Sequence, residues 1–446
     1  MSSVVVIGGG LAGSEAAWQA ARFGVPVTLY EMRPDMQTEA HRTGLLGELV
    51  CSNSLRSDLP DTAHGLLKQE LTLLGSLIME AARQTSVPAG SALAVDRALF
   101  AKYITEAIES NPNIEVIRRE CRDISEFCST SSDGSPIAYI LATGPLTSQS
   151  MSNSLAQILG RDSLFFYDAI APVIDAETID YSKVFSASRY GKGGDDYINC
   201  PMDTECYHTF YEALVSADKV SVRDFEDNKV FEGCMPIEVM ASRGIDTPRF
   251  GPMKPVGLID PETQKQPYAV VQLRTENAEK TAYNMVGFQT RLKYPEQQRI
   301  FRMIPGLQNA EFLRFGSVHR NTYINSPACL TTELAIKGHE HILLAGQITG
   351  VEGYIESTAM GLFAGVAAAR KVRGVSFVAP SETTSVGALI KYVTTEKAHG
   401  AFQPSNINFS LFPPPEVKCK DKSIRRQRIV ERALTEIDGF IKTAYR

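Results

Sequence analysis

The sequence lacks the features that mark membrane-spanning, exported and metal-binding proteins. No apolar run approaches the roughly 18 residues of a membrane-spanning helix, and MSSVVVIGGG has no basic stretch before an apolar core. We therefore predict neither a membrane span nor a signal peptide. The eight cysteines form no C-x-x-C pair, which argues against zinc ribbons and thioredoxin-type redox chemistry. A cytoplasmic protein with reduced thiols and no bound metal is the expectation.

Positive charge is scarce over the whole chain but concentrated in two segments. The net charge is −6 over 446 residues. Residues 243–320 nevertheless carry twelve lysines and arginines against seven acids, and residues 417–446 carry nine against four. Such segments in an acidic protein favour an electropositive face for a polyanion such as nucleic acid. A solvated surface would give the same counts.

The N-terminal segment VVVIGGGLAGSEAAWQAARFGVPVTLYE predicts a complete βαβ unit. Strands are expected at residues 4–7 and 27–30, with a helix at 11–23 that contains the only tryptophan, Trp18. The G-x-G-x-x-G turn between strand and helix lets backbone N–H groups approach a pyrophosphate, and an acid after the second strand can bind ribose hydroxyls. The predicted dinucleotide contacts are Gly8, Gly9, Gly10, Leu11, Ala12, Gly13 and Glu31.

Two later segments favour FAD over NAD as this ligand. YILATG, residues 139–144, is a strand that runs into Thr143 and Gly144. HILLAGQITGVEGYIESTAMG, residues 341–361, is a buried strand followed by a glycine-rich turn that opens a helix near Ser357. A helix N-terminus there would stabilise a reduced, anionic flavin. The predicted flavin contacts in this segment are Gly346, Gln347, Gly353 and Tyr354, although Tyr354 stacks on a ring no more often than it packs.

These elements predict an α/β fold with a Rossmann-type FAD-binding domain, resembling two-dinucleotide flavoproteins, and a smaller inserted α+β domain. We expect residues 1–193 and 337–446 to form the first domain and residues 194–336 the insert. The strand candidates in the insert are NKVFE, YAVVQL and EFLRFG, which alternate with glycine and proline turns. Helices are expected at 386–394 and, with a basic surface, at 421–445.

Five long blocks resemble one enzyme family. GELVCSNSLRSD, EGCMPIEVMASRGIDTPRFGPMKPVGL, NMVGFQTRLKYPEQQRIFRMIPGL, RFGSVHRNTYINSP and LAGQITGVEGYIESTAMGL are similar to the folate- and FAD-dependent tRNA (uracil-5-)-methyltransferases, relatives of the GidA-type flavoproteins. The resemblance implies ribothymidine formation in the tRNA T arm. It implies 5,10-methylenetetrahydrofolate as carbon donor, FAD as hydride donor, and NADPH or NADH as reductant.

The resemblance also implies roles for two thiols. Cys234 corresponds to the nucleophile that adds at C6 of uracil, and Cys51 to the base beside the flavin. C5 of uracil is a poor nucleophile until a thiolate adds at C6, so covalent addition divides a hard step into easier ones. Without the family, a buried inert cysteine would be the better interpretation of each. Cys200 also falls where the family has a cysteine, but the reaction shows no need for a further thiol. Cys121, Cys128, Cys206, Cys329 and Cys419 are interpreted as structural.

Several cations and aromatic residues are candidates for substrate contacts. Arg243, Arg249 and Lys254 follow Cys234 closely and can lower the pKa of its thiol. Tyr283, Phe288 and Tyr294 interleave with Arg291 and Lys293, a pattern that stacks a base or pterin and grips phosphate, although aromatics at these spacings are more often core. His41, His319 and Arg320 are weaker candidates, since structural histidines are as common. Tyr294 stands where many relatives have tryptophan.

Four other functions stay open from the sequence. The same chemistry on a ribosomal-RNA uridine is the first, because the contacts that select the substrate are not evident. A GidA-type wobble-uridine enzyme is disfavoured because the chain lacks that family's long C-terminal extension. An FAD-dependent oxidoreductase of a small metabolite would leave the basic segments without a role. A non-catalytic RNA-binding flavoprotein would leave both thiols idle.

Overall fold

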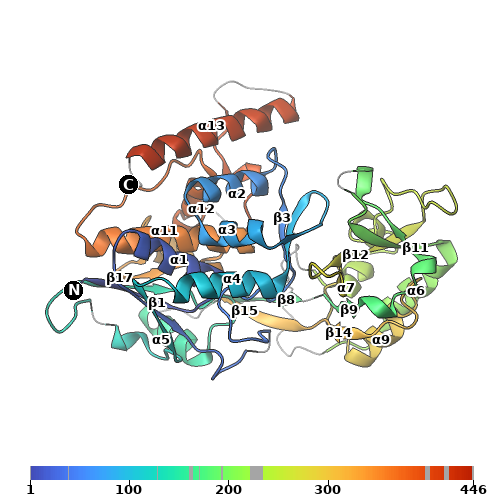
Figure 1. The fold of residues 1–446 in the computed structure, drawn as a ribbon, viewed down its shortest axis with the longest axis horizontal. Coiled ribbons are helices and arrows are strands. Elements are labelled where there is room, and N and C mark those ends of the chain that lie inside the picture. Colours follow the sequence, from blue (N-terminus) through green and yellow to red (C-terminus); the bar gives the residue numbers. More distant parts are fainter. Residues whose placement is uncertain are drawn as a thin grey trace.

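The structure, a computed structural model, describes residues 2–38, 40–127, 129–159, 164–169, 171–191, 194–220, 235–396, 402–415 and 421–443. Two bodies lie side by side along the longest axis of the molecule (Figure 1). The first contains the N-terminal strand and the C-terminal helix, and the second holds the middle of the chain.

The first body is built on a six-stranded sheet of order β16-β17-β7-β1-β2-β6. All neighbours pair in parallel except β16 with β17. The strands are β1 Ser3–Ile7, β2 Val27–Glu31, β6 Ile114–Arg118, β7 Ile137–Leu141, β16 Ala335–Ile336 and β17 His339–Leu344. Because the first and last thirds of the chain contribute adjacent parallel strands, the predicted α/β class and βαβ unit are confirmed.

Two helices cross this sheet in direct contact with each other. They are α1 Leu11–Arg22 and α11 Tyr354–Val372. A Cβ at Gly361 would lie 2.2 Å from the Ala12 carbonyl oxygen, and one at Gly365 would lie 2.4 Å from that of Ala16. Only glycine permits this backbone approach. Gly361 and Gly365 therefore allow α11 to pack closely on α1, some 350 residues earlier in the chain.

Further helices and a small sheet complete the first body. The three-stranded sheet has the order β3-β5-β4. Its strands are β3 Ser54–Ser57, β4 Ser86–Val87 and β5 Ala92–Val95. The helices are α2 Ala63–Leu73, α3 Leu77–Gln84, α4 Arg97–Glu109, α5 Gln149–Leu159, α10 Ser326–Cys329, α12 Ser385–Thr394 and α13 Lys422–Thr443. The two predicted C-terminal helices are thus confirmed to within two residues. Within the described ranges, no helix is both long and apolar enough to span a bilayer.

The second body contains a six-stranded sheet of order β10-β11-β12-β13-β9-β14. Its strands are β9 Val173–Asp175, β10 Phe185–Ser186, β11 Tyr197–Met202, β12 Ala269–Thr275, β13 Ala282–Met285 and β14 Phe312–Arg314. Its helices are α6 Thr204–Ser216, α7 Ile237–Ser242, α8 Thr247–Phe250 and α9 Tyr294–Phe301. The predicted strands YAVVQL and EFLRFG correspond to β12 and β14. NKVFE lies outside the described residues.

The predicted boundary at residue 194 divides this second sheet, because β9 and β10 precede it. A separate ribbon of β8 Leu164–Ala169 and β15 Val318–Tyr323 pairs the segments that precede and follow the strands of the second sheet. Buried side chains also join the bodies. Asn53 donates to the Thr275 carbonyl at 2.9 Å, and Arg274 donates to the Asn53 amide oxygen at 3.0 Å.

Candidate cofactor and catalytic site

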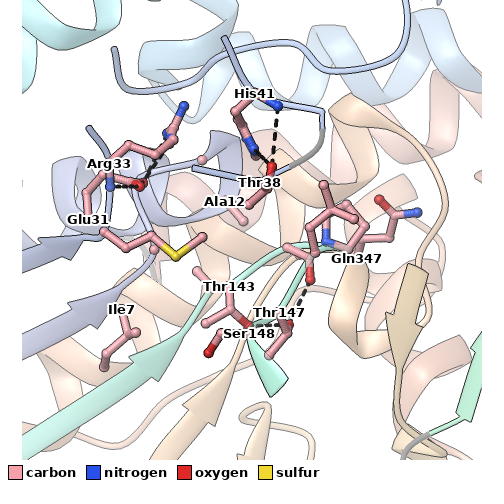
Figure 2. A pocket seen from close by; sticks show the side chains of 18 of the residues that line it. Ile7, Ala12, Glu31, Arg33, Thr38, His41, Thr143, Thr147, Ser148 and Gln347 are labelled. Carbon is pink, nitrogen blue, oxygen red and sulfur yellow. Dashed lines mark hydrogen bonds and ion pairs between the residues drawn. The ribbon is translucent and has the colours of Figure 1, made fainter. Parts of the chain in front are cut away.

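A cavity opens where the parallel strands of the first body end and where α1 and α11 begin (Figure 2). We call it the nucleotide cavity. Ten of the thirteen predicted cofactor contacts line it: Gly8, Gly10, Leu11, Ala12, Glu31, Thr143, Gly144, Gly346, Gln347 and Tyr354. Gly9 and Gly13 lie directly behind this wall, and Gly353 precedes α11 as its N-cap. Neither α1 nor α11 has a side-chain cap, so the first N–H groups of both helices remain available to an anion.

Glycine occupies the three positions of the first turn, Gly8, Gly10 and Gly13, for different reasons. A Cβ at Gly13 would lie 1.7 Å from the Gly8 carbonyl oxygen, so Gly13 allows the helix to pack on the strand end. Gly8 has φ +102° and a Cβ there would lie 2.5 Å from the Ala142 oxygen. A Cβ at Gly10 would meet no protein atom within 4 Å. The structure itself therefore does not require glycine at Gly10, but a ligand backed against the turn would.

Glu31 is held by a buried ion pair behind the turn. Its carboxylate accepts from the Gly9 N–H at 2.8 Å and from the Arg33 guanidinium at 2.9 and 3.0 Å, a contact drawn in Figure 2. Burial alone raises the pKa of Glu31, but the Arg33 contacts outweigh it and the pKa lies below its ordinary value. Glu31 is thus a carboxylate whose acceptor geometry is fixed before any ribose arrives.

Sequence reasoning named Thr143 and His41 on the cavity wall but missed their partners there, Thr147 and Thr38. Thr143 and Thr147 share a hydrogen bond of 2.7 Å between their hydroxyls. His41 lies across the cavity and contacts the Thr38 hydroxyl at 2.5 Å through Nδ1. Burial and the nearby Arg33 lower the pKa of His41 to about 4, so it is neutral at physiological pH. His41 therefore offers a neutral polar group and no positive charge to a ligand.

A second cavity, the Cys51 cavity, adjoins the first. The two share Val50, Pro145, Leu146, Gln347 and Tyr354, and the second is also lined by Cys51, Arg56, Gln289, Asn321, Glu352 and Glu356. Tyr354 stands between them. Its hydroxyl oxygen accepts the N–H of Cys51 at 2.8 Å and that of Ser52 at 3.1 Å. Desolvation, with the neighbouring Cys51, raises the pKa of Tyr354 above its ordinary value.

Cys51 itself is half-buried, and side chains from both bodies contact its backbone. Its carbonyl oxygen accepts from Arg97 of α4 and from Arg314 of β14, each at 3.1 Å. The two arginines lie 46 and 263 positions away in the chain. No local sequence pattern links them to Cys51, and sequence reasoning missed both.

The structure places the predicted substrate residues unevenly. Cys234 lies outside the described residues, as do the side chains of His319 and Arg320. Tyr283 is buried in the core of the second body, together with Phe288. Both rings pack in this core, which is the role that aromatic residues at these spacings more often have.

Most of the predicted substrate cations have protein partners. Arg249 lies 3.6 Å over the Tyr268 ring and pairs with Asp246 at 2.6 Å. Arg291 pairs with the buried Glu238 at 3.7 Å, and Lys293 pairs with Asp218 at 3.2 Å. Of the remaining candidates, Arg243 is exposed and Lys254 is half-buried. Tyr294 is exposed and stacks on Phe315 with ring centroids 4.7 Å apart. The excess of positive charge counted over residues 243–320 is thus larger than the unpaired positive charge that these residues present at the surface.

The remaining cysteines differ in their surroundings. Cys200 is fully buried in β11, and burial raises the pKa of its thiol. Cys329 is also buried, and Cys206 contacts the Met303 carbonyl at 3.9 Å. Cys121 lines the nucleotide cavity, which its structural interpretation did not anticipate. Cys128 and Cys419 lie outside the described residues. No group of histidine, cysteine and acidic side chains suited to a metal ion occurs in the described part of the chain.

The parallel sheet, the glycine-rich turn and the two uncapped helices define a dinucleotide-binding α/β protein with an inserted second body. Its fold is similar to that of GidA from Aquifex aeolicus, with a TM-score of 0.70 and 18% identity over 98% of this chain and 73% of that chain. Residues 3–376 match the family described as GIDA, glucose inhibited division protein A.

Two curated relatives are similar over nearly the whole chain. One, from Moorella thermoacetica, is 56% identical over 97% of this chain and 96% of its own length. Another, from Geobacter sulfurreducens, is 54% identical over 99% of each chain. Both are named methylenetetrahydrofolate--tRNA-(uracil-5-)-methyltransferase TrmFO. The chain therefore belongs to the GIDA family and, within it, to the TrmFO methyltransferases.

Proposed function

We propose that this chain methylates C5 of a uridine in the T arm of tRNA, with 5,10-methylenetetrahydrofolate as carbon donor and reduced FAD as hydride donor. The observation that carries the proposal is the position of Cys51. Its cavity meets the nucleotide cavity at Tyr354, whose hydroxyl holds the Cys51 backbone. A proton acceptor, a substrate cavity and a cofactor cavity are thus adjacent.

The residues of the nucleotide cavity fit FAD. Gly10 leaves open space where a Cβ would project toward a pyrophosphate, Glu31 presents a fixed carboxylate to ribose, and Gly346 and Tyr354 border the part expected for the flavin ring. When bound and reduced, FAD supplies a hydride to a carbon electrophile, and NADPH or NADH restores its reduced form.

The protein groups supply the nucleophile and the base. The Cys234 thiolate adds to C6 of uracil, and the electron pair of the C5–C6 double bond moves to C5 and its carbonyl. C5 then attacks the methylene carbon, whose bond to the first of its two folate nitrogens breaks. Cys51 takes the C5 proton, and the electron pair left at C5 expels the second folate nitrogen to give an exocyclic methylene. A hydride adds to this methylene to form the methyl group, the C5–C6 double bond is restored, and the sulfur–C6 bond breaks to release the Cys234 thiolate. Overall, the C5 hydrogen is replaced by CH₃ and tetrahydrofolate is released.

Tritium release tests this proposal. The reduced, FAD-loaded chain is incubated with tRNA labelled at C5 of uridine, with methylenetetrahydrofolate as the only carbon donor. We expect tritium in water and ribothymidine in the T arm. A ribosomal-RNA fragment of matched length serves as competing substrate. Release from that fragment alone would reassign the substrate, and release from neither would exclude uridine C5 chemistry.

RNA that carries 5-fluorouridine separates the roles of the two thiols. Fluorine replaces the C5 proton, so the covalent adduct requires the nucleophile but not the base. We expect Cys51→Ala and a control, Cys206→Ala, to form an adduct that survives denaturing electrophoresis, whereas Cys234→Ala forms none. An adduct from Cys234→Ala would overturn the assignment, and its loss from Cys51→Ala alone would reverse it.

A further inference from the structure

The Cys51 backbone is fixed by side chains from three distant elements. Tyr354 of α11 accepts its N–H at 2.8 Å. Arg97 of α4 and Arg314 of β14 both donate to its carbonyl oxygen, each at 3.1 Å. Arg314 belongs to the second body, whereas Cys51, Arg97 and Tyr354 belong to the first. The position of Cys51 therefore depends on how the second body docks against the first.

Of the two guanidinium groups at Cys51, that of Arg97 has a carboxylate partner among the described residues. Arg97 forms an ion pair with Glu276, which is largely buried. Arg314 forms no ion pair within the described residues, and its Nε atom is buried without a hydrogen bond there. Burial and repulsion from Arg97 lower the pKa of Arg314 to about 10, so it stays charged at neutral pH. The cluster thus carries one uncompensated positive charge beside Cys51.

A negative sulfur at Cys51 would supply the missing charge. Such a thiolate is close enough to both guanidinium groups to raise the pKa of each. Low-pKa cysteines occur where arginine or lysine side chains surround a partly exposed sulfur. Cys51 is half-buried, and two guanidinium groups lie 3.1 Å from its carbonyl oxygen.

The other charged groups of the Cys51 cavity have partners of their own. Arg56 contacts His64 at 3.2 Å, and His64 lies 3.7 Å from the buried carboxylate of Glu356. Burial lowers the pKa of His64 to about 4, with Arg56 contributing. Glu352 accepts from a neighbouring side-chain amide at 2.9 Å. Within the described chain, the charged or titratable residues that line the cavity are Cys51, Arg56, Glu352, Tyr354 and Glu356. Arg97 and Arg314 do not line it and reach Cys51 through its carbonyl oxygen.

We infer that Arg314, with Arg97, is a positioning residue that holds Cys51 as a thiolate when the second body is docked. The inference rests on the proposed function, in which Cys51 takes the C5 proton. A thiolate accepts that proton and becomes a thiol, and the proton then passes to water before the next turnover. A neutral thiol cannot take the proton, so the surplus charge of Arg314 prepares the base before RNA binds.

The test measures how fast iodoacetamide alkylates Cys51 in the full-length, FAD-loaded chain as pH is varied, with the Cys51 peptide quantified by mass spectrometry. Arg314→Gln removes the charge, and alkylation at neutral pH should slow about tenfold, with the rate recovered at higher pH. Arg314→Lys should stay near wild type. Arg302→Gln is the matched control, because Arg302 also donates to a backbone carbonyl, that of Ala310, in the second body.

Flavin absorbance and the melting temperature establish that each variant is folded, and Arg314→Met carries the same test if Arg314→Gln is not recovered. A rate–pH curve of either neutral variant that superposes on wild type overturns the inference. So does equal slowing by Arg302→Gln. The readout needs no RNA or folate, so failure of uridine methylation in the wild-type chain would be seen separately in tritium release. Where methylation occurs, its rate in Arg314→Gln should rise with pH across the range where wild type is flat.

Discussion

Replacing Gly10 by alanine should weaken FAD binding while leaving the fold intact. In the structure a Cβ at Gly10 meets no protein atom within 4 Å, and the residue has φ −74°, which alanine adopts without strain. Alanine is a poorer N-cap than glycine, at a cost of about 1 kcal/mol or less. The methyl group, however, points to where a pyrophosphate would approach the first N–H groups of α1.

The expected loss follows from the hydrogen bonds that the methyl group prevents. A hydrogen bond to a charged group contributes about 1.5–3 kcal/mol, so losing one corresponds to roughly a ten- to hundredfold weaker Kd for FAD. The assay is titration of the apoprotein, followed by quenching of flavin fluorescence, with thermal unfolding measured in parallel.

Two other glycines supply the controls. Gly439 in α13 also has open space around its Cβ, so Gly439→Ala should bind FAD normally and gain up to about 1 kcal/mol of helix stability. Gly13→Ala places a Cβ 1.7 Å from the Gly8 oxygen and should destabilise the fold itself. Wild-type affinity in Gly10→Ala would refute the assignment of this turn as the pyrophosphate site.

Three further outcomes are expected. Tyr354→Phe leaves two partly buried N–H groups, one of them on Cys51, without their acceptor, and should lower the free energy of unfolding by about 1 kcal/mol; an unchanged melting temperature would argue against that contact. Glu70 has a folded-state pKa raised to about 7 by burial, against 4.5 unfolded, so its proton favours the folded state and stability falls as pH rises between those values. Glu70→Gln should therefore gain up to about 3 kcal/mol relative to wild type between pH 4.5 and 7, and parallel stability curves from denaturant titrations would exclude this. Reversing the charge of the exposed Arg425 and Arg426 on α13 should weaken tRNA binding and reduce its salt dependence without altering the flavin spectrum, measured by filter binding; equal affinity for variant and wild type would remove α13 from the RNA surface.

Elements that depend on a continuous local pattern could be predicted from the sequence. The glycines of the first turn and the alternation of β1, α1 and β2 lie within one continuous stretch, so spacing alone defined that unit. The contacts at Cys51 could not be found this way, because Arg97, Arg314 and Tyr354 reach it only through the tertiary fold.

Charge in the neighbouring sequence did not distinguish a buried aromatic residue from an exposed one. Tyr283 alternates with cations in the sequence, yet β13 pairs on both sides within its sheet and its ring faces the core. Neighbouring charge indicates a surface only where a strand has one face in solvent. The predicted boundary at residue 194 does not separate the two sheets. The strand β9 precedes it, is only three residues long, and pairs with β13 and β14 much further along the chain.

The contact between α1 and α11 joins two segments that leave the ribosome far apart in time. The β1–α1–β2 unit emerges first, but Ala12 and Ala16 are covered by Gly361 and Gly365, which are synthesised some 350 residues later. The strands of the second sheet, which end at Arg314, also precede α11 in the chain. A nascent chain that stalls before β17 would carry the whole glycine-rich turn and yet lack Gly346, Gln347 and Tyr354 of the nucleotide-cavity wall.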